Sequence, residues 1–301
     1  MQHSVFFISA RKGYAKEGLL AEGYDVINPY RDKTLIGRII REIWFQCGFS
    51  EKIWYTRIKK SFKYIIVQDP LVTKTYLKWL VNSQPTSIIH FIYGNQIGRA
   101  KHVKPKDIPK EINTWTFDQN DSKKYGINLH SSGGYSKSYI GKKNHILFDV
   151  FYVGADKGRG EFICDLERKM RQLGLKTKFI ITADKKIARK KRYYSRPIPY
   201  SKVIEYNNSS KAILNIVLPN QIGATMRDFE SIFNSIKLIT NNNNIKNYDF
   251  YRAENVFILG ERNLSELIDF LKTPFKPIEQ VNLEKYTISA LVDEIISSRT
   301  N

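Results

Sequence analysis

The chain has 301 residues, and its 42% hydrophobic and 13% aromatic content excludes a disordered chain and leaves room for two domains. The formal charge of +20, from 49 Lys and Arg against 29 Asp and Glu, favours a polyanionic partner: nucleic acid, an anionic membrane surface or a phosphate-bearing substrate. Two cysteines, Cys47 and Cys164, form neither a disulfide framework nor a metal spacing, which indicates a cytosolic chain. The first residues do not resemble a signal peptide, and no apolar run of about 18 residues predicts a transmembrane helix.

The first half of the chain alternates short apolar runs with longer amphipathic ones. Helices are predicted at 34–49 and at 70–83, the second with Pro70 in its first turn. An alternation of strands and helices is typical of a parallel sheet with helical crossovers. The predicted strands are 4–10, 24–28, 63–69, 86–95 and 113–118.

A polar stretch rich in Gly, Ser and Lys at 130–144 is the predicted linker, and the α/β pattern restarts after it. Open α/β sheets bind ligands outside the carboxyl ends of their strands, so we predict two Rossmann-like α/β domains that face a cleft. The predicted strands are 145–159, 175–182, 211–217, 237–240 and 255–260. The predicted helices are 160–174, 200–210, 263–272 and 283–299.

The stretch from Gln221 to Glu230, "QIGATMRDFE", combines a polar turn with the start of a helix. The free amides and positive dipole end of such a turn suit a phosphate, which Gly223 lets approach and to which Thr225 can donate a hydroxyl. Arg227 can pair with a diphosphate, and Glu230, on the same helical face, can accept hydrogen bonds from a ribose diol. The alternative is structural: Thr225 as a helix N-cap, Gly223 as a turn, and Arg227 with Glu230 as a solvated pair.

A second segment, "VGADKGRGE" at 153–161, points to the same chemistry. It ends a predicted buried strand and opens a helix, and Gly154, Lys157, Gly158 and Arg159 supply flexibility and two cations where a phosphate would lie. The segment matches neither the Walker loop nor the GxGxxG fingerprint.

These motifs resemble those of a family of bacterial glycosyltransferases with the two-domain GT-B architecture, found in capsule, lipopolysaccharide and related cell-surface polysaccharide synthesis. The resemblance covers most of the chain. It is carried by "FYVGADKGR" (151–159), "KAILNIVLPNQIGATMRDFESIFNSIKLITNN" (211–242), "YDFYRAENVFILG" (248–260), "QDP" (68–70) and "TWTFDQNDSKKYGINL" (114–129).

The resemblance implies three parts: an acceptor-binding domain at 1–140, a nucleotide-sugar-binding domain at 141–280, and a helix at 281–301 that packs back on the first domain. Carried over, Glu230 would hold the ribose, and Lys157, Arg159 and Arg227 the diphosphate. Such enzymes do not usually need a metal, and no cofactor is expected. A UDP-sugar is the default donor, and a glycan, lipid-linked or not, is the acceptor. The remaining expected pocket residues are Gly154, Gln221, Gly223, Thr225 and, facing the cleft, Asn241.

The catalytic base of an inverting transferase would come from the first domain. Asp69 and Asp118 lie at predicted strand ends and are the candidates, although either can equally be a helix N-cap, as can Asp121. His90 lies within an apolar strand and is expected in the core. A retaining mechanism needs no such base, and this alternative stays open.

The segment 33–63 carries eight Lys and Arg against two acidic residues, with aromatic residues between them. This composition suits an anionic membrane surface, which would place the chain at the inner face of the cell membrane. Alternatively, its aromatic residues, Trp44 and Phe45 above all, belong to the core of the first domain. Two other functions compete with the transferase: a basic nucleic-acid-binding protein, although no nucleic-acid motif is present, and an inactive GT-B-like partner subunit.

Overall fold

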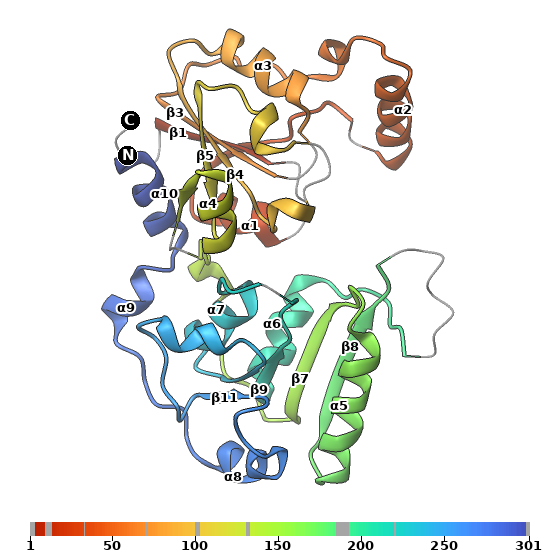
Figure 1. The fold of residues 1–301 in the computed structure, drawn as a ribbon, viewed down its shortest axis with the longest axis vertical. Coiled ribbons are helices and arrows are strands. Elements are labelled where there is room, and N and C mark those ends of the chain that lie inside the picture. Colours follow the sequence, from red (N-terminus) through yellow and green to blue (C-terminus); the bar gives the residue numbers. More distant parts are fainter. Residues whose placement is uncertain are drawn as a thin grey trace. The chain divides into compact units, whose positions relative to one another are not determined.

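The computed structural model describes residues 4–9, 14–32, 34–69, 72–99, 103–130, 133–184, 193–219 and 221–298. The chain divides into two compact units (Figure 1). Unit 1 comprises Met1–Ser132 with Ile288–Asn301, and unit 2 comprises Gly133–Thr287. Each unit contains one parallel sheet flanked by helices, which confirms the predicted α/β class and is compatible with two Rossmann-like domains.

Unit 1 is built on a six-stranded sheet of order β2-β1-β3-β4-β5-β6, in which every pair is parallel. Its strands are β1 (Val5–Ser9), β2 (Asp25–Ile27), β3 (Tyr64–Gln68), β4 (Ile88–Ile92), β5 (Ile112–Thr116) and β6 (Asn128–Leu129). Its helices are α1 (Tyr14–Ala21), α2 (Leu35–Gln46), α3 (Lys74–Ser83), α4 (Gln119–Tyr125) and α10 (Ile288–Ser297). The start of the predicted second helix, Pro70, lies outside the described residues, and Thr73 caps α3.

Both faces of this sheet are buried, as expected for a parallel sheet. Alternate residues of β1 enter different cores: Phe6 and Ile8 join the cluster that contains α3, and Val5 and Phe7 join the cluster that contains α1 and α10. The apolar face of α10 therefore completes one of the two cores of unit 1. The predicted helix at 283–299 is divided, because α9 (Gln280–Glu284) ends before α10 begins.

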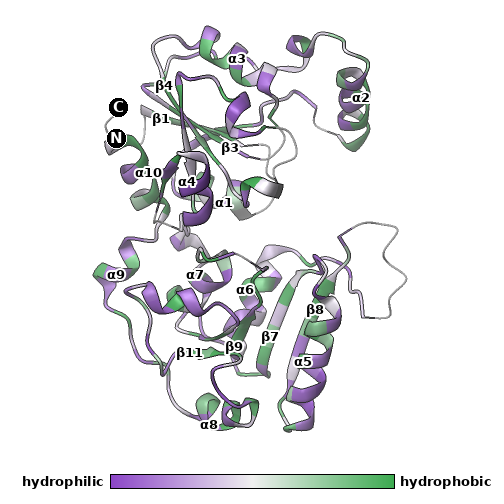
Figure 2. Cartoon of the chain, in the orientation of Figure 1, coloured by the Kyte–Doolittle hydropathy of each residue, from purple (hydrophilic) through white to green (hydrophobic). Residues whose placement is uncertain are grey.

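Unit 2 is built on a five-stranded parallel sheet of order β11-β10-β9-β7-β8. Its strands are β7 (Phe148–Ala155), β8 (Thr177–Thr182), β9 (Ser210–Asn215), β10 (Lys237–Thr240) and β11 (Val256–Ile258). Its helices are α5 (Gly160–Gln172), α6 (Tyr200–Asn208), α7 (Met226–Phe233), α8 (Leu267–Lys272) and α9. Figure 2 shows the hydrophobic residues of these strands between helices that carry hydrophilic ones.

The strand order of unit 2 creates a topological switch point. The chain leaves β7 to form β8 on one side and returns to form β9 on the other side of β7. The loops after β7 and β9 therefore diverge at the carboxyl edge of the sheet, the place where open α/β sheets bind ligands.

The predicted linker at 130–144 is only partly a linker. Tyr135 is fully buried in unit 2, where its ring stacks on Phe233 at 4.7 Å between centroids and its hydroxyl accepts a hydrogen bond from Asn234. The aromatic residues within this polar stretch thus anchor it to unit 2. Within the described ranges, no helix has the length and apolar character that crossing a membrane requires.

Candidate functional site

The two segments that the sequence singled out meet at the switch point of unit 2. Arg159 lies just before α5, and its guanidinium donates hydrogen bonds to the carbonyl of Ile216, beyond β9, and to that of Ala155, the last residue of β7, at 3.4 Å. Arg227, on α7, donates to the carbonyl of Val153 in β7 at 3.3 Å. One guanidinium thus links the turn after β7 to the loop after β9, and the other links α7 to β7.

Arg227 forms an ion pair with Glu230 that is buried, not solvated. The Glu230 side chain is 1% exposed and that of Arg227 is 20% exposed. Tyr200 donates its hydroxyl to Oε1 of Glu230 at 2.9 Å, and Asn207 donates its amide to Oε2 at 2.8 Å. Both carboxylate oxygens therefore have protein donors, two of which come from α6.

Thr225 is the N-cap of α7 and forms a capping box with Asp228. The Thr225 side chain accepts from the amide of Arg227, and the amide of Thr225 donates to Oδ2 of Asp228 at 2.6 Å. Asn215, at the end of β9, donates to Oδ1 of Asp228 at 2.8 Å. Burial raises the pKa of Asp228 to about 6, because the desolvation of its carboxylate outweighs these hydrogen bonds.

Asp156 lies three residues before Arg159, the N-cap of α5. Its Oδ1 accepts from the amide of Gly160 at 2.6 Å, and its Oδ2 accepts from the hydroxyl of Tyr194. Burial acts to raise the pKa of Asp156, but the Tyr194 and backbone donors hold it below its usual range. An internal carboxylate thus neutralises the positive end of this helix.

Tyr152 lies beneath these turns, and its hydroxyl is buried without a hydrogen-bond partner among the described residues. Burial raises the pKa of Tyr152, whereas the charges of Arg159 and Arg227 act to lower it. A Cβ at position 154 would lie 2.6 Å from this hydroxyl. Gly154 is therefore needed to make room for the Tyr152 side chain two residues earlier on the same strand face.

The other expected donor residues lie on the loops at the same edge of the sheet. Lys157 is exposed, adopts a left-handed backbone with φ of 49°, and donates its amide to Asp184 at 2.6 Å. Asn241 follows β10 and pairs with the backbone of Val217, accepting from its amide at 2.7 Å and donating to its carbonyl at 3.3 Å. Gln221 is partly buried and Gly223 is buried in the turn before α7.

The candidate catalytic carboxylates belong to unit 1. Asp118 is the N-cap of α4: its Oδ1 accepts from the amides of Asn120 at 2.9 Å and of Asp121 at 3.1 Å, as the capping alternative expected. Asp69 follows β3 and is 3% exposed. His90 is a core histidine, 1% exposed, whose Nδ1 accepts the indole hydrogen of Trp115.

The sequence did not single out the groups that organise the site. Asp156 and Asp228 lie within the two quoted motifs, and the Thr-x-x-Asp spacing of the capping box was a usable signal for Asp228. Tyr200 and Asn207 are two turns apart on α6. Their hydrogen bonds to Glu230 are tertiary contacts that no local sequence pattern predicts.

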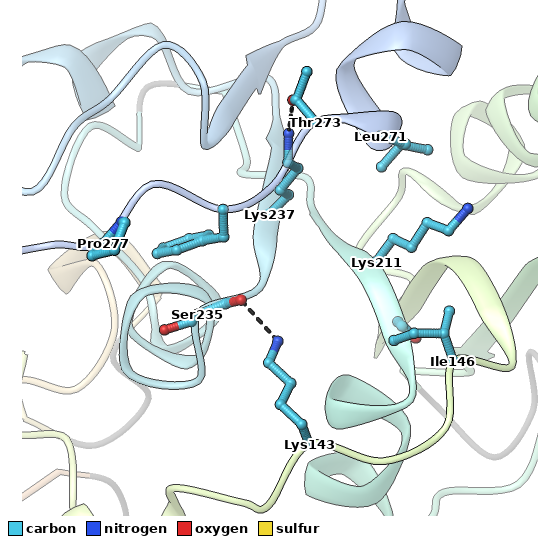
Figure 3. Close-up of a pocket in the computed structure, with 10 residues that line it drawn as sticks. Lys143, Ile146, Lys211, Ser235, Lys237, Leu271, Thr273 and Pro277 are labelled. Carbon is cyan, nitrogen blue, oxygen red and sulfur yellow. Dashed lines mark hydrogen bonds between the residues drawn. The ribbon is translucent and has the colours of Figure 1, made fainter.

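A cavity of about 390 Å³ opens at the opposite, amino edge of the unit 2 sheet (Figure 3). Lys143 points at the carbonyl of Ser235, just beyond α7, at 2.8 Å. Lys237 donates to the carbonyl of Phe270 and to the hydroxyl of Thr273 at the end of α8. These ammonium groups donate to polar groups at the carboxyl ends of helices. Helix capping therefore explains why lysines line the cavity.

The described residues contain no group of three or more His, Cys, Asp and Glu side chains that could hold a metal ion. A scan against models of protein families finds no match for the chain, and a search of curated proteins finds no relative.

Proposed function

We propose that the chain is a glycosyltransferase of GT-B architecture that transfers a sugar from a nucleotide-sugar donor, by default a UDP-sugar, to a glycan acceptor. Unit 2 would bind the donor, and unit 1 would supply the acceptor site. The main support is that Arg159 and Arg227, from segments far apart in sequence, both lie at the β7–β9 switch point. There Arg159 donates to the carbonyl of Ile216, and Arg227 donates to the carbonyl of Val153. The excess of 20 positive charges also suits an anionic substrate.

The charged side chains at this edge define how a diphosphate would be held. The amides of Arg227 and Gly160, in the first turns of α7 and α5, already donate to Thr225 and Asp156. A diphosphate would therefore rest mainly on cationic side chains, with exposed Lys157 the most accessible of them. Preorganised positive charge stabilises a leaving diphosphate without a metal ion.

Glu230 has a positioning role in this proposal. It can accept a ribose hydroxyl only if the residues that cover it move, because its side chain is 1% exposed and its oxygens already accept from Tyr200 and Asn207. While these bonds last, the carboxylate fixes the guanidinium of Arg227. Asp69 and Asp118 stay as the candidate bases, and capping of α4 already occupies Asp118 Oδ1.

The test is a metal-free thermal-shift series with UDP, GDP, CMP, ADP, dTDP and a short oligonucleotide. We expect UDP to raise the melting temperature, since a ligand of the native state stabilises it by mass action. Lys157→Gln should reduce that increase, whereas Lys176→Gln, the same change at an exposed residue before β8, should not.

Two outcomes would overturn the proposal. One is that no nucleotide raises the melting temperature of the parent chain. The other is a shift with the oligonucleotide alone that weakens steeply with salt, which favours the nucleic-acid alternative. A third outcome, nucleotide binding without sugar transfer to any glycan acceptor, would also overturn the proposal and would favour the inactive partner subunit.

A further inference from the structure

Helix α2 directs its apolar face to the solvent. Residues at positions i, i+1, i+4, i+5 and i+8 share one side of a helix, and on α2 these are all aliphatic. Their exposed fractions are 68% for Leu35, 71% for Ile36, 51% for Ile39, 50% for Ile40 and 55% for Ile43. A surface helix normally buries such a stripe against the core, and α2 does the reverse.

The opposite side of α2 explains this orientation. Arg41 is its only buried residue, 2% exposed, and its guanidinium stacks over the ring of Tyr30 at 3.9 Å. Arg41 also pairs with Asp32 at 3.1 Å and with Glu42 at 3.0 Å. Phe45 packs on the same core. Turning the aliphatic face inward would expose this arrangement, so the outward orientation is built into the fold.

The apolar surface continues beyond the helix. Phe49 is 56% exposed and Ile53 is 54% exposed, on the segment that follows α2. Figure 1 shows α2 at the outer edge of unit 1, apart from the strands, and Figure 2 shows hydrophobic residues along it. We call Leu35, Ile36, Ile39, Ile40, Ile43, Phe49 and Ile53 the α2 patch.

Along the segment 34–63, which carries the α2 patch, the most exposed charged residues are basic. The acidic residues of this region are engaged internally: Asp32 and Glu42 pair with Arg41, and Glu51 accepts the hydroxyl of Tyr55 at 2.9 Å. The basic residues other than Arg41, in contrast, are exposed to solvent. They are Arg38, Lys52, Arg57, Lys59, Lys60 and Lys63.

We infer that the α2 patch binds the surface of an anionic lipid bilayer, with α2 lying in the interfacial plane. Aliphatic and aromatic side chains that enter the acyl boundary, with lysine and arginine at the level of acidic headgroups, are the features of an interfacial helix. The charge of the surrounding residues selects this occupant over an uncharged apolar partner. The inference is independent of the transferase chemistry of unit 2.

The test is co-sedimentation of the full chain with lipid vesicles. We expect the chain to pellet with vesicles of phosphatidylcholine containing a third phosphatidylglycerol, and far less with phosphatidylcholine alone or at high salt. Ile36→Ser with Ile39→Ser should weaken binding to the anionic vesicles by on the order of tenfold. Leu20→Ser with Val281→Ser, the same change at side chains 51% and 63% exposed elsewhere, should leave it unaltered.

Both double variants should keep the melting temperature of the parent, because all four side chains are exposed. Equal binding of the two variants to anionic vesicles would overturn the inference, as would failure of the parent chain to bind them. A parent chain that binds no vesicle but sediments as a dimer, and as a monomer after the α2 substitutions, would assign the patch to a second copy of the chain and likewise overturn it.

Discussion

Replacing Arg227 with methionine tests whether the buried ion pair of unit 2 is a structural necessity. The change leaves the carboxylate of Glu230, 1% exposed, with only Tyr200 and Asn207 as donors. Removing one partner of a buried ion pair costs about 3–5 kcal/mol, because the remaining charge is desolvated without compensation. For a unit of this size, that loss lowers the melting temperature by roughly 10 °C.

The unpaired charge of Glu230, and not the lost packing of Arg227, should account for most of this loss of stability. Glu230→Gln removes the charge and keeps an oxygen for the Tyr200 hydroxyl, and its new amide can donate to Oδ1 of Asn207, which has no partner. We therefore expect Arg227→Met with Glu230→Gln to be destabilised by only about 1–2 kcal/mol. The second substitution would then recover about 2–3 kcal/mol of the stability that Arg227→Met loses.

The assay is urea unfolding at pH 7, followed by far-ultraviolet circular dichroism. Arg168→Met is the matched control, because Arg168 pairs with Asp165 at the same helical spacing but on the exposed surface of α5. An exposed pair of this kind contributes little to stability. The reasoning fails if Arg227→Met unfolds at the same urea concentration as the control, or if the double variant is no more stable than Arg227→Met alone.

Two further predictions concern buried titratable groups. Burial lowers the pKa of His90 to about 4, whereas the pKa of histidine in the unfolded chain is about 6.5. As the pH drops from about 6.5 towards 4, the unfolded chain is therefore protonated at His90 and the folded chain is not, so the stability of the fold decreases. In urea titrations, the free energy of unfolding should decrease between pH 7 and pH 5 by about 2 kcal/mol less in His90→Gln than in the parent. An unchanged pH dependence would contradict this. Lys237→Met should cost about 2–4 kcal/mol, because it leaves the carbonyls of Glu254 and Phe270 without their ammonium donor. Exposed Lys211→Met, at the same cavity, is the control, and equal melting temperatures for the two variants would count against the capping role.

Much of the fold was predictable because its strands are apolar runs bounded by turns. The segments that became β3, β4 and β7 are nearly continuous stretches of aliphatic and aromatic residues, as buried parallel strands require. The break between α9 and α10 was not predictable. It is set by Tyr286, whose ring contacts Phe229 at 5.3 Å and whose hydroxyl donates to Asp249 at 2.7 Å, and these are contacts between distant segments.

The site, like the fold, was only partly predictable from the sequence. Glycine and charge patterns located the two loops of the switch point, because each pattern is local. The burial of Glu230 was not foreseen, because it depends on the approach of α6, and the sequence analysis had allowed only a ligand role or a solvated pair. The cause of the orientation of α2 was equally hidden: Arg41 stacks inward on Tyr30, which reverses the direction that aliphatic periodicity normally implies.

The contribution of α10 to unit 1 has a consequence for biosynthesis. Ile288, Leu291 and Ile295 of α10 complete a core whose buried residues outside this helix lie between Val5 and Trp115. Translation proceeds from the amino terminus, so all of unit 2 leaves the ribosome before unit 1 can close this face of its sheet. Unit 2 can therefore mature first, while the nascent unit 1 presents an uncovered aliphatic surface that chaperones recognise. A premature stop before Ile288 would leave that surface permanently uncovered.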